Sequence, residues 1–338
     1  MKICFCESSA QTIWRHFDNR IAGKPLFGHT PNAGPLLAEA LPTHKLPYVN
    51  DPSIFGTNLE LLGPDETRIW GIPEHAPLHL LVSREKRSRS NARVVAHSAV
   101  SDLPAKAFLE LRPGIHVLSP EHLFVRHARN SDLISQIMLG YELAGCYSIR
   151  SDLDQGFFQR PPLCSTKTLS SFLSEADGMP GIKQARTALP LIIEGSASPR
   201  ETGLVMMLCL PARLGGYGLP APKMNVRLDL GKDAKPFWGE RNAFDLVWQR
   251  EKLIVEYDGM CHGEEAARIR DTLRRDASLL AGYSVFTIMR DRMETPEDML
   301  VIARAVAKKL GVQLRPRSKD FERKNRELWR RVIRSPHP

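Results

Sequence analysis

The chain has 338 residues, of which 42% are apolar and 25% charged. These proportions exclude a disordered or fibrous chain, and the length predicts two globular domains. Forty-seven Lys and Arg against 38 Asp and Glu give a formal charge of +9. An excess of this sign favours a polyanionic partner, because the release of condensed counterions drives association.

No apolar run approaches the roughly 20 residues that span a bilayer. The opening Met1–Cys6 is too short for the apolar core of a secretory signal. The six scattered cysteines show neither a disulfide framework nor paired zinc spacing. We therefore expect a cytoplasmic protein with no membrane partner.

Residues 1–195 predict an α+β domain with a possible regulatory role. Strand-length apolar runs occupy Leu78–Val82, Val94–His97 and His116–Leu118. Helical stretches run from Ser9 to Arg20, from an N-cap at Ser119, and over 131–145, 168–176 and 181–194. The small residues Gly195–Ser198 are typical of a hinge, so we place the domain boundary after Gly195.

Residues 196–312 predict a second domain with the order α-β-β-β-α-β-α. Its helices are expected at 198–210, 264–281 and 296–310, and its strands at 224–230, 243–248, 252–257 and 284–289. A basic tail, 313–338, follows. Residues 315–334 hold nine basic and three acidic side chains, six of the nine excess positive charges.

Three acidic residues interrupt the second and third predicted strands of this domain. Glu256 and Asp258 share one strand face because they are two residues apart. If the short connection closes as a hairpin centred between Arg250 and Glu251, Asp245 falls opposite Glu256, with Cβ atoms roughly 4.5–5.5 Å apart. Three carboxylates this close resist ionisation together unless a cation lies between them.

Magnesium or manganese fits such a cluster, because Mg²⁺ takes oxygen ligands from one or two carboxylates and from phosphate. In a nuclease, such an ion would polarise the scissile phosphate and help to generate hydroxide from water. The alternative interpretation is that Asp258 merely begins a turn, while Asp245 and Glu256 face solvent on an edge strand.

Glu201 and His262 are further catalytic candidates. Ser198 and Glu201 have the spacing of a capping box, so Glu201 has either a capping or a metal-supporting role, or both. His262 follows the third strand, where it would act as a general acid or base or would be only structural.

Four arginines are candidates for contacts with nucleic acid: Arg270, Arg274, Arg275 and Arg290. Those on the predicted helix 264–281 form a basic face. Such a face either contacts phosphates or is simply solvated.

A set of short motifs in this region resembles a known family. The motifs are Ser198-Pro-Arg-Glu201, Asn242-Ala-Phe-Asp245, Val255-Glu-Tyr-Asp-Gly259 with His262, Arg270-Asp271, Arg275-Asp276 and Val285-Phe-Thr-Ile-Met-Arg290. Together they resemble an uncharacterised bacterial domain family grouped with the very-short-patch-repair (Vsr-like) endonucleases of the PD-(D/E)xK superfamily. The resemblance spans about a third of the chain.

The resemblance implies a restriction-endonuclease-like α/β fold, a mixed sheet flanked by helices. It also implies metal ligation by Asp245 and Glu256, with the Tyr257 carbonyl as a third oxygen. The superfamily's usual Lys is replaced by Asp258, as in the pattern of this subfamily itself, which removes a cation that would stabilise a developing anion. Cys261 stands where such sequences often have Gln.

The N-terminal domain loosely resembles proteins associated with abortive-infection antitoxins, through the stretch Ser119–Ala128 and the domain order. The leading hypothesis is a metal-dependent DNA endonuclease in defence, repair or a mobile element. The alternatives are a non-cleaving nucleic-acid-binding or toxin–antitoxin regulatory protein, and a purely structural module. The sequence leaves the oligomeric state open.

Overall fold

The structure is a computed structural model. It describes residues 2–17, 48–49, 52–57, 59–62, 67, 70–83, 90–99, 103–228, 243–258, 272, 275–314 and 319–334. The chain divides into two compact units. Unit 1 comprises the described residues up to Ala144 together with Ser148–Ile192, and unit 2 comprises Gly145–Tyr147 and the described residues from Ile193 onward. The predicted hinge, Gly195–Ser198, lies in unit 2.

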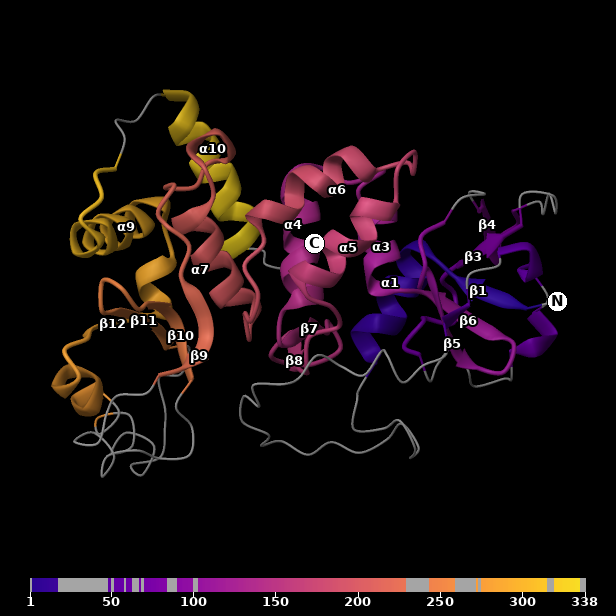
Figure 1. Cartoon of the computed structure of the whole chain (residues 1–338), viewed down its shortest axis with the longest axis horizontal. Coiled ribbons are helices and arrows are strands. Elements are labelled where there is room, and N and C mark those ends of the chain that lie inside the picture. Colours follow the sequence, from indigo (N-terminus) through magenta and orange to yellow (C-terminus); the bar gives the residue numbers. More distant parts are fainter. Residues whose placement is uncertain are drawn as a thin grey trace. The chain divides into compact units, whose positions relative to one another are not determined.

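Unit 1 is built on a six-stranded mixed sheet with the order β2-β5-β6-β1-β3-β4 (Figure 1). The strands are β1 (Ile3–Phe5), β2 (Tyr48–Val49), β3 (Leu78–Val82), β4 (Val94–Ser98), β5 (Phe108–Arg112) and β6 (Ile115–Leu118). The central strands β1 and β6 run parallel, and every residue in both is buried. Their runs are apolar apart from His116, as expected for strands covered on both faces.

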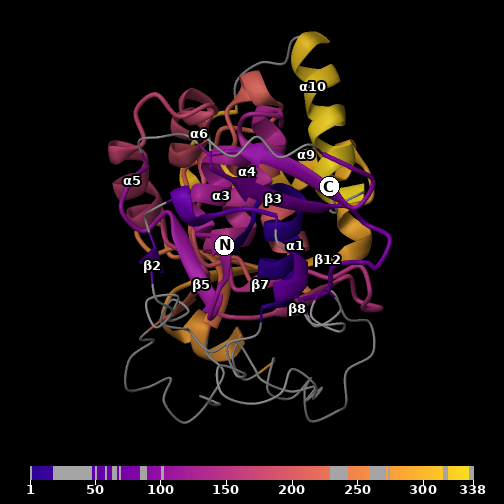
Figure 2. The same ribbon diagram turned by 90° about the vertical axis from the view of Figure 1, so that its right-hand side faces the viewer.

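Helices α1 (Glu7–His16), α3 (Pro120–His127), α4 (Leu133–Ala144), α5 (Thr166–Glu175) and α6 (Ile182–Ala188) complete unit 1, with the short turns η3 (Pro52–Ile54), η4 (Leu59–Leu61) and η5 (Leu189–Leu191). Helices α3 to α6 pack together as one group (Figure 2). The predicted N-cap of α3 is confirmed, because the Ser119 hydroxyl accepts the His122 N–H at 3.2 Å. Strands β7 (Tyr147–Ile149) and β8 (Phe157–Gln159) pair separately.

Unit 2 contains a four-stranded mixed sheet with the order β12-β11-β10-β9. Its strands are β9 (Lys223–Arg227), β10 (Ala243–Trp248), β11 (Leu253–Asp258) and β12 (Ser284–Met289). Neighbours are antiparallel except β11 and β12, which run parallel. Helices α7 (Pro199–Cys209) and α9 (Pro296–Leu310), with the turns η6 (Ala212–Leu214) and η8 (Arg290–Met293), belong to this unit. The predicted α/β class is confirmed.

The C-terminal segment folds onto α7. Helix α10 (Lys319–Trp329) continues into the π-helical turn η9 (Arg330–Arg334), and Leu328 and Val332 are buried. A Cβ at Gly203 of α7 would lie 2.3 Å from the Val332 carbonyl oxygen, so only glycine permits this close approach. Within the stretch defined from sequence as a basic tail, residues 319–334 therefore form an amphipathic helix with its apolar face in the core of unit 2.

None of the helices within the described ranges combines the length and the apolar character that a bilayer crossing requires.

His122 of α3 is buried, with 1% exposure. Its ring lies 5.4 Å from Phe108 and 5.9 Å from Phe172, and its Nδ1–H donates to the Ala107 carbonyl at 3.2 Å. The pKa of His122 is lowered to about 3. Burial is the main cause, the positive charge of Arg126 acts in the same direction, and the bond to Ala107 partly opposes both.

The depressed pKa of His122 predicts acid sensitivity. Between pH 6.5 and 3 this imidazole is protonated in the unfolded chain but neutral in the folded state. The free energy of unfolding therefore falls as the pH falls. His122→Asn keeps an N–H donor near the Nδ1 position for the Ala107 carbonyl but does not titrate. We expect the variant to lose about 2 kcal/mol less stability than the wild type between pH 7 and pH 5. Urea unfolding at both pH values measures this, and equal losses would contradict it.

Candidate functional site

The central strands of the unit 2 sheet separate where the predicted acidic residues begin. Strands β10 and β11 pair at Trp248↔Leu253, Val247↔Ile254 and Leu246↔Val255. Beyond the last pair β10 remains paired with β9, as far as Ala243, and β11 remains paired with β12, as far as Asp258. Within these described strands, the pairing of β10 with β11 therefore ends earlier than the pairing of either strand with its outer neighbour.

The observed pairs confirm the hairpin register predicted from the short connection. Continuing that register by one residue places Asp245 opposite Glu256. The Asp245 carboxylate accepts the backbone N–H of Tyr257 through Oδ2 at 2.7 Å, so a side chain bonds to β11 just beyond the point where the regular ladder ends. This bond fixes the Asp245 side chain beside the Glu256–Tyr257 peptide.

The two facing acids are half-buried, whereas Asp258 is exposed. One oxygen of Glu256, Oε1, is shielded from solvent. Two carboxylates held on neighbouring strands away from bulk water repel each other, and the repulsion is relieved by a proton or by a cation. The bond to Tyr257 uses part of the acceptor capacity of Asp245, since a carboxylate offers about four lone-pair sites.

Glu201, near the start of α7, is 7% exposed and firmly held. The predicted N-cap is confirmed, because the Ser198 hydroxyl accepts the Glu201 N–H at 3.2 Å. The return contact of the Glu201 carboxylate differs from a capping box. It accepts the Ala197 N–H at 3.0 Å, one residue earlier than that motif requires, and the Ser198 hydroxyl at 2.9 Å.

Asn225 of β9 is a site residue that the sequence interpretation missed. Its amide donates to Glu201 Oε2 at 2.6 Å and to the Gly195 carbonyl at 2.8 Å. Its φ of +46° lies in the left-handed region, which Asn tolerates better than most residues. The signal available in the sequence was a polar residue between the apolar Met224 and Val226 of a predicted strand.

Register places four polar residues side by side across the sheet. Asn225 falls opposite Asp245, between the pairs Met224↔Leu246 and Val226↔Phe244, and Glu256 pairs with Thr287. We call Asn225, Asp245, Glu256 and Thr287 the polar row. Glu201 joins the row through its bond to Asn225, so residues from α7 and all four strands converge there.

Burial dominates the electrostatics at this place. It raises the pKa of Glu201, while the donors Ala197, Asn225 and Ser198 act to lower that pKa. Burial also raises the pKa of the Tyr257 phenol, and the positive charges of Arg200 and Arg290 oppose that rise. Arg290 is therefore within electrostatic reach of the end of β11.

The remaining predicted residues are either exposed or lie outside the described residues. Arg290 begins η8 directly after β12 and is exposed, and Arg275 is exposed in the helical residues 275–280. His262, Arg270 and Arg274 lie outside the described residues. Whether phosphates contact any of these arginines stays a prediction.

The oxygen donors on β10 and β11 determine whether a divalent metal fits this place. In the part of the chain that the structure describes, no group of three or more His, Cys, Asp and Glu side chains is arranged to hold a metal ion. The facing pair Asp245 and Glu256 meets the smaller requirement of Mg²⁺, which is bound through one or two carboxylates and retains several waters. The donor set therefore fits a hard cation of this kind.

Comparison with known proteins gives no match: no family model, no curated protein and no solved structure is similar to this chain.

The contact between Asn225 and Glu201 can be tested with Asn225→Asp, which is nearly isosteric. It places a second carboxylate 2.6 Å from Glu201 Oε2, so the two negative charges repel once both are ionised. We expect little effect at pH 4 and a loss of about 1–3 kcal/mol at pH 7, measured by denaturant unfolding. Asn225→Ala is the matched control: it removes the same donor from Glu201 without adding a charge, so its loss should increase less between pH 4 and pH 7 than that of the Asp variant. A pH-independent loss in the Asp variant would contradict the assignment.

Proposed function

We propose that unit 2 is a metal-dependent DNA endonuclease domain, with a restriction-endonuclease-like fold related to the Vsr-like enzymes. The observation that carries the proposal is the separation of β10 and β11 where Asp245 and Glu256 face each other. An acidic pair between strands that are still paired on their outer sides provides a rigid, preformed cation site. Rigid placement of charged groups is what metal-assisted phosphodiester hydrolysis requires.

The order of elements supports the same proposal. Helix α7 precedes an antiparallel meander, β9 to β11, the helical residues 275–280 and β12 follow, and α9 ends the series. This order, with β12 parallel to β11, agrees with the mixed sheet flanked by helices that the resemblance implies.

Asp245, Glu256 and the Tyr257 carbonyl would hold Mg²⁺ or Mn²⁺. When bound, the ion would polarise the scissile phosphate and lower the pKa of a coordinated water. The Tyr257 N–H holds Asp245 in place through Oδ2, so this side chain need not reorganise on binding. Glu201, held by Asn225 and the Ala197 N–H, supports the row from α7. His262 stays a candidate general acid or base.

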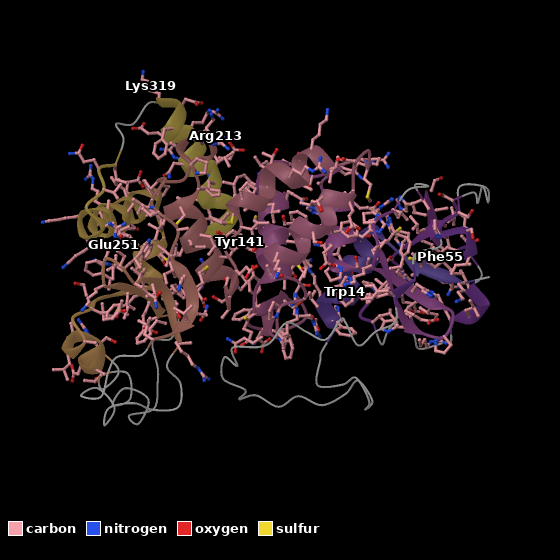
Figure 3. The ribbon with its side chains drawn as sticks, in the orientation of Figure 1. Trp14, Phe55, Tyr141, Arg213, Glu251 and Lys319 are labelled. Carbon is pink, nitrogen blue, oxygen red and sulfur yellow. The ribbon has the colours of Figure 1, made fainter. Side chains whose placement is uncertain are left out.

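DNA is the proposed partner, and exposed positive charge in unit 2 supports it. Arg326 and Arg330 lie one helical turn apart on the exposed face that runs from α10 into η9, and Lys319 lies at the beginning of α10 (Figure 3). Arg323 and Lys324 are already paired with Asp320, at 2.9 and 2.8 Å. Neither Arg326 nor Arg330 forms an ion pair with another described residue, which leaves both for phosphate contacts.

Asp258 favours one alternative, a nucleic-acid-binding or toxin–antitoxin regulatory protein that keeps the fold without cleaving. An acidic side chain here, exposed beyond Glu256, adds negative charge where the superfamily has a Lys. The missing Lys removes stabilisation of the developing anion, whereas the exposed arginines of unit 2 would still attract the duplex.

Supercoiled plasmid incubated with Mn²⁺ or Mg²⁺ tests the proposal. We expect nicking by the wild-type protein that falls on the order of 100-fold in Asp245→Asn and in Glu256→Gln, because each removes a charged ligand. Asn at 245 retains an oxygen acceptor for the Tyr257 N–H, so the fold is preserved. Glu251→Gln is the matched control, since Glu251 is an exposed carboxylate in the β10–β11 turn (Figure 3).

The outcomes separate the hypotheses. Metal-dependent nicking that both site variants lose, and Glu251→Gln keeps, supports the endonuclease. Salt-dependent DNA binding by all four proteins without nicking supports the non-cleaving alternative and contradicts the proposal. Absence of DNA binding at moderate salt contradicts both.

A further inference from the structure

Unit 1 contains a strained acidic residue at the junction of β1 and α1. Glu7, the first residue of α1, has a φ of +46°, in the left-handed region that residues other than glycine rarely adopt. Such strain persists only where the surrounding structure compensates for it, and it is concentrated at functional sites.

The Glu7 carboxylate is held by an arginine and faces a histidine. Arg126 of α3 donates to Glu7 Oε1 through Nε at 2.9 Å and through a terminal nitrogen at 2.6 Å. His97 of β4 approaches the same oxygen, with Nδ1 at 3.8 Å. The three side chains are mostly buried, with 14% exposure at Glu7, 9% at Arg126 and 23% at His97.

His97 is in turn bonded to a second histidine. Its Nε2 lies 2.9 Å from Nδ1 of His79 on the neighbouring strand β3, and the two rings stack with centroids 5.1 Å apart. The His79 backbone is fixed by the start of α1, because its N–H donates to the Ser9 hydroxyl and its carbonyl accepts the Cys6 N–H, both at 2.9 Å. The order of contacts is Glu7, His97, His79.

One assignment of protons satisfies all of these contacts. With a proton on Nδ1, His97 directs an N–H toward the Glu7 carboxylate, and its Nε2 is an acceptor. His79 then carries its proton on Nδ1 and donates it to His97 Nε2. Nε2 of His79 is left as a lone pair, and no hydrogen bond from another described residue ends on it.

We propose that Glu7, His97 and His79 form a proton-relay site, in which Nε2 of His79 accepts a proton from a substrate hydroxyl or a water molecule. The O–H bond of the donor breaks, a new N–H bond forms on His79, and the donor is left as an alkoxide or hydroxide. The resulting positive charge on His79 is stabilised through His97 by the Glu7 carboxylate. The site is a second chemical centre, independent of the function proposed for unit 2.

The charges around the relay agree with this direction of transfer. Burial lowers the pKa of both histidines, and the Glu7 carboxylate raises both, so the pair is uncharged and ready to accept a proton at neutral pH. Arg126 and Arg129, with His79 itself, lower the pKa of His97. Glu7 is therefore the group that favours a protonated relay.

Acylation by diethyl pyrocarbonate, a probe of neutral imidazole nucleophiles, tests the relay in the full-length protein. His79 Nε2 forms an N–C bond to one carbonyl carbon, and the anhydride C–O bond breaks to release ethyl carbonate. Peptide mass spectrometry gives the rate at His79 relative to the exposed His75 across a pH series. In Glu7→Gln we expect the limiting relative rate to fall severalfold and the midpoint of the pH profile to move down.

Loss of the Glu7 charge could prevent folding, so His97→Asn is the second variant. It interrupts the relay but leaves the Glu7–Arg126 pair intact. It should lower the limiting rate at His79 in the same way. Ser8→Ala, an exposed neighbour of Glu7, is the matched control and should leave the rate unchanged. Unchanged rates in folded Glu7→Gln or His97→Asn, or an Nε2–H tautomer of His79 in ¹⁵N NMR spectra, would overturn the proposal.

Discussion

Two carboxylates on adjacent strands, Asp245 and Glu256, impose the constraint around which unit 2 is organised. Half-buried acids this close are unfavourable unless something compensates their charge. The structure supplies one part of that compensation, the bond from the Tyr257 N–H to Asp245. A divalent cation between the strands would supply the remainder. The two acids that repel each other are therefore also the proposed metal ligands.

The rest of unit 2 holds this unfavourable arrangement in place. The outer strands keep β10 and β11 paired on their far sides, so the break between them is local. Helix α7 presents Glu201 to Asn225, and Gly203 in the same helix allows η9 to pack against it, backbone to backbone. The C-terminal helix therefore stabilises α7, which contacts the polar row through Glu201. The same helix also exposes basic side chains to solvent.

Sequence predicted the parts of the fold that local rules determine. Period-two and apolar patterns located β10 and β12, and the short connection determined the register that brings Asp245 opposite Glu256. Contacts between residues far apart in the sequence could not be predicted from local patterns. Asn225 is a site residue only because a left-handed backbone turns it to Glu201, and the relay in unit 1 joins Glu7 to histidines about 70 and 90 residues away.

Direct measurement of metal binding tests the central claim, that Asp245 and Glu256 jointly hold one divalent ion. Metal-free protein titrated with Mn²⁺, with free Mn²⁺ followed by electron paramagnetic resonance, gives the stoichiometry and affinity without reference to activity. The account predicts one site per chain, weakened on the order of 100-fold in Asp245→Asn and in Glu256→Gln and unchanged in Glu251→Gln. Equal affinity in the wild-type protein and both site variants would contradict it.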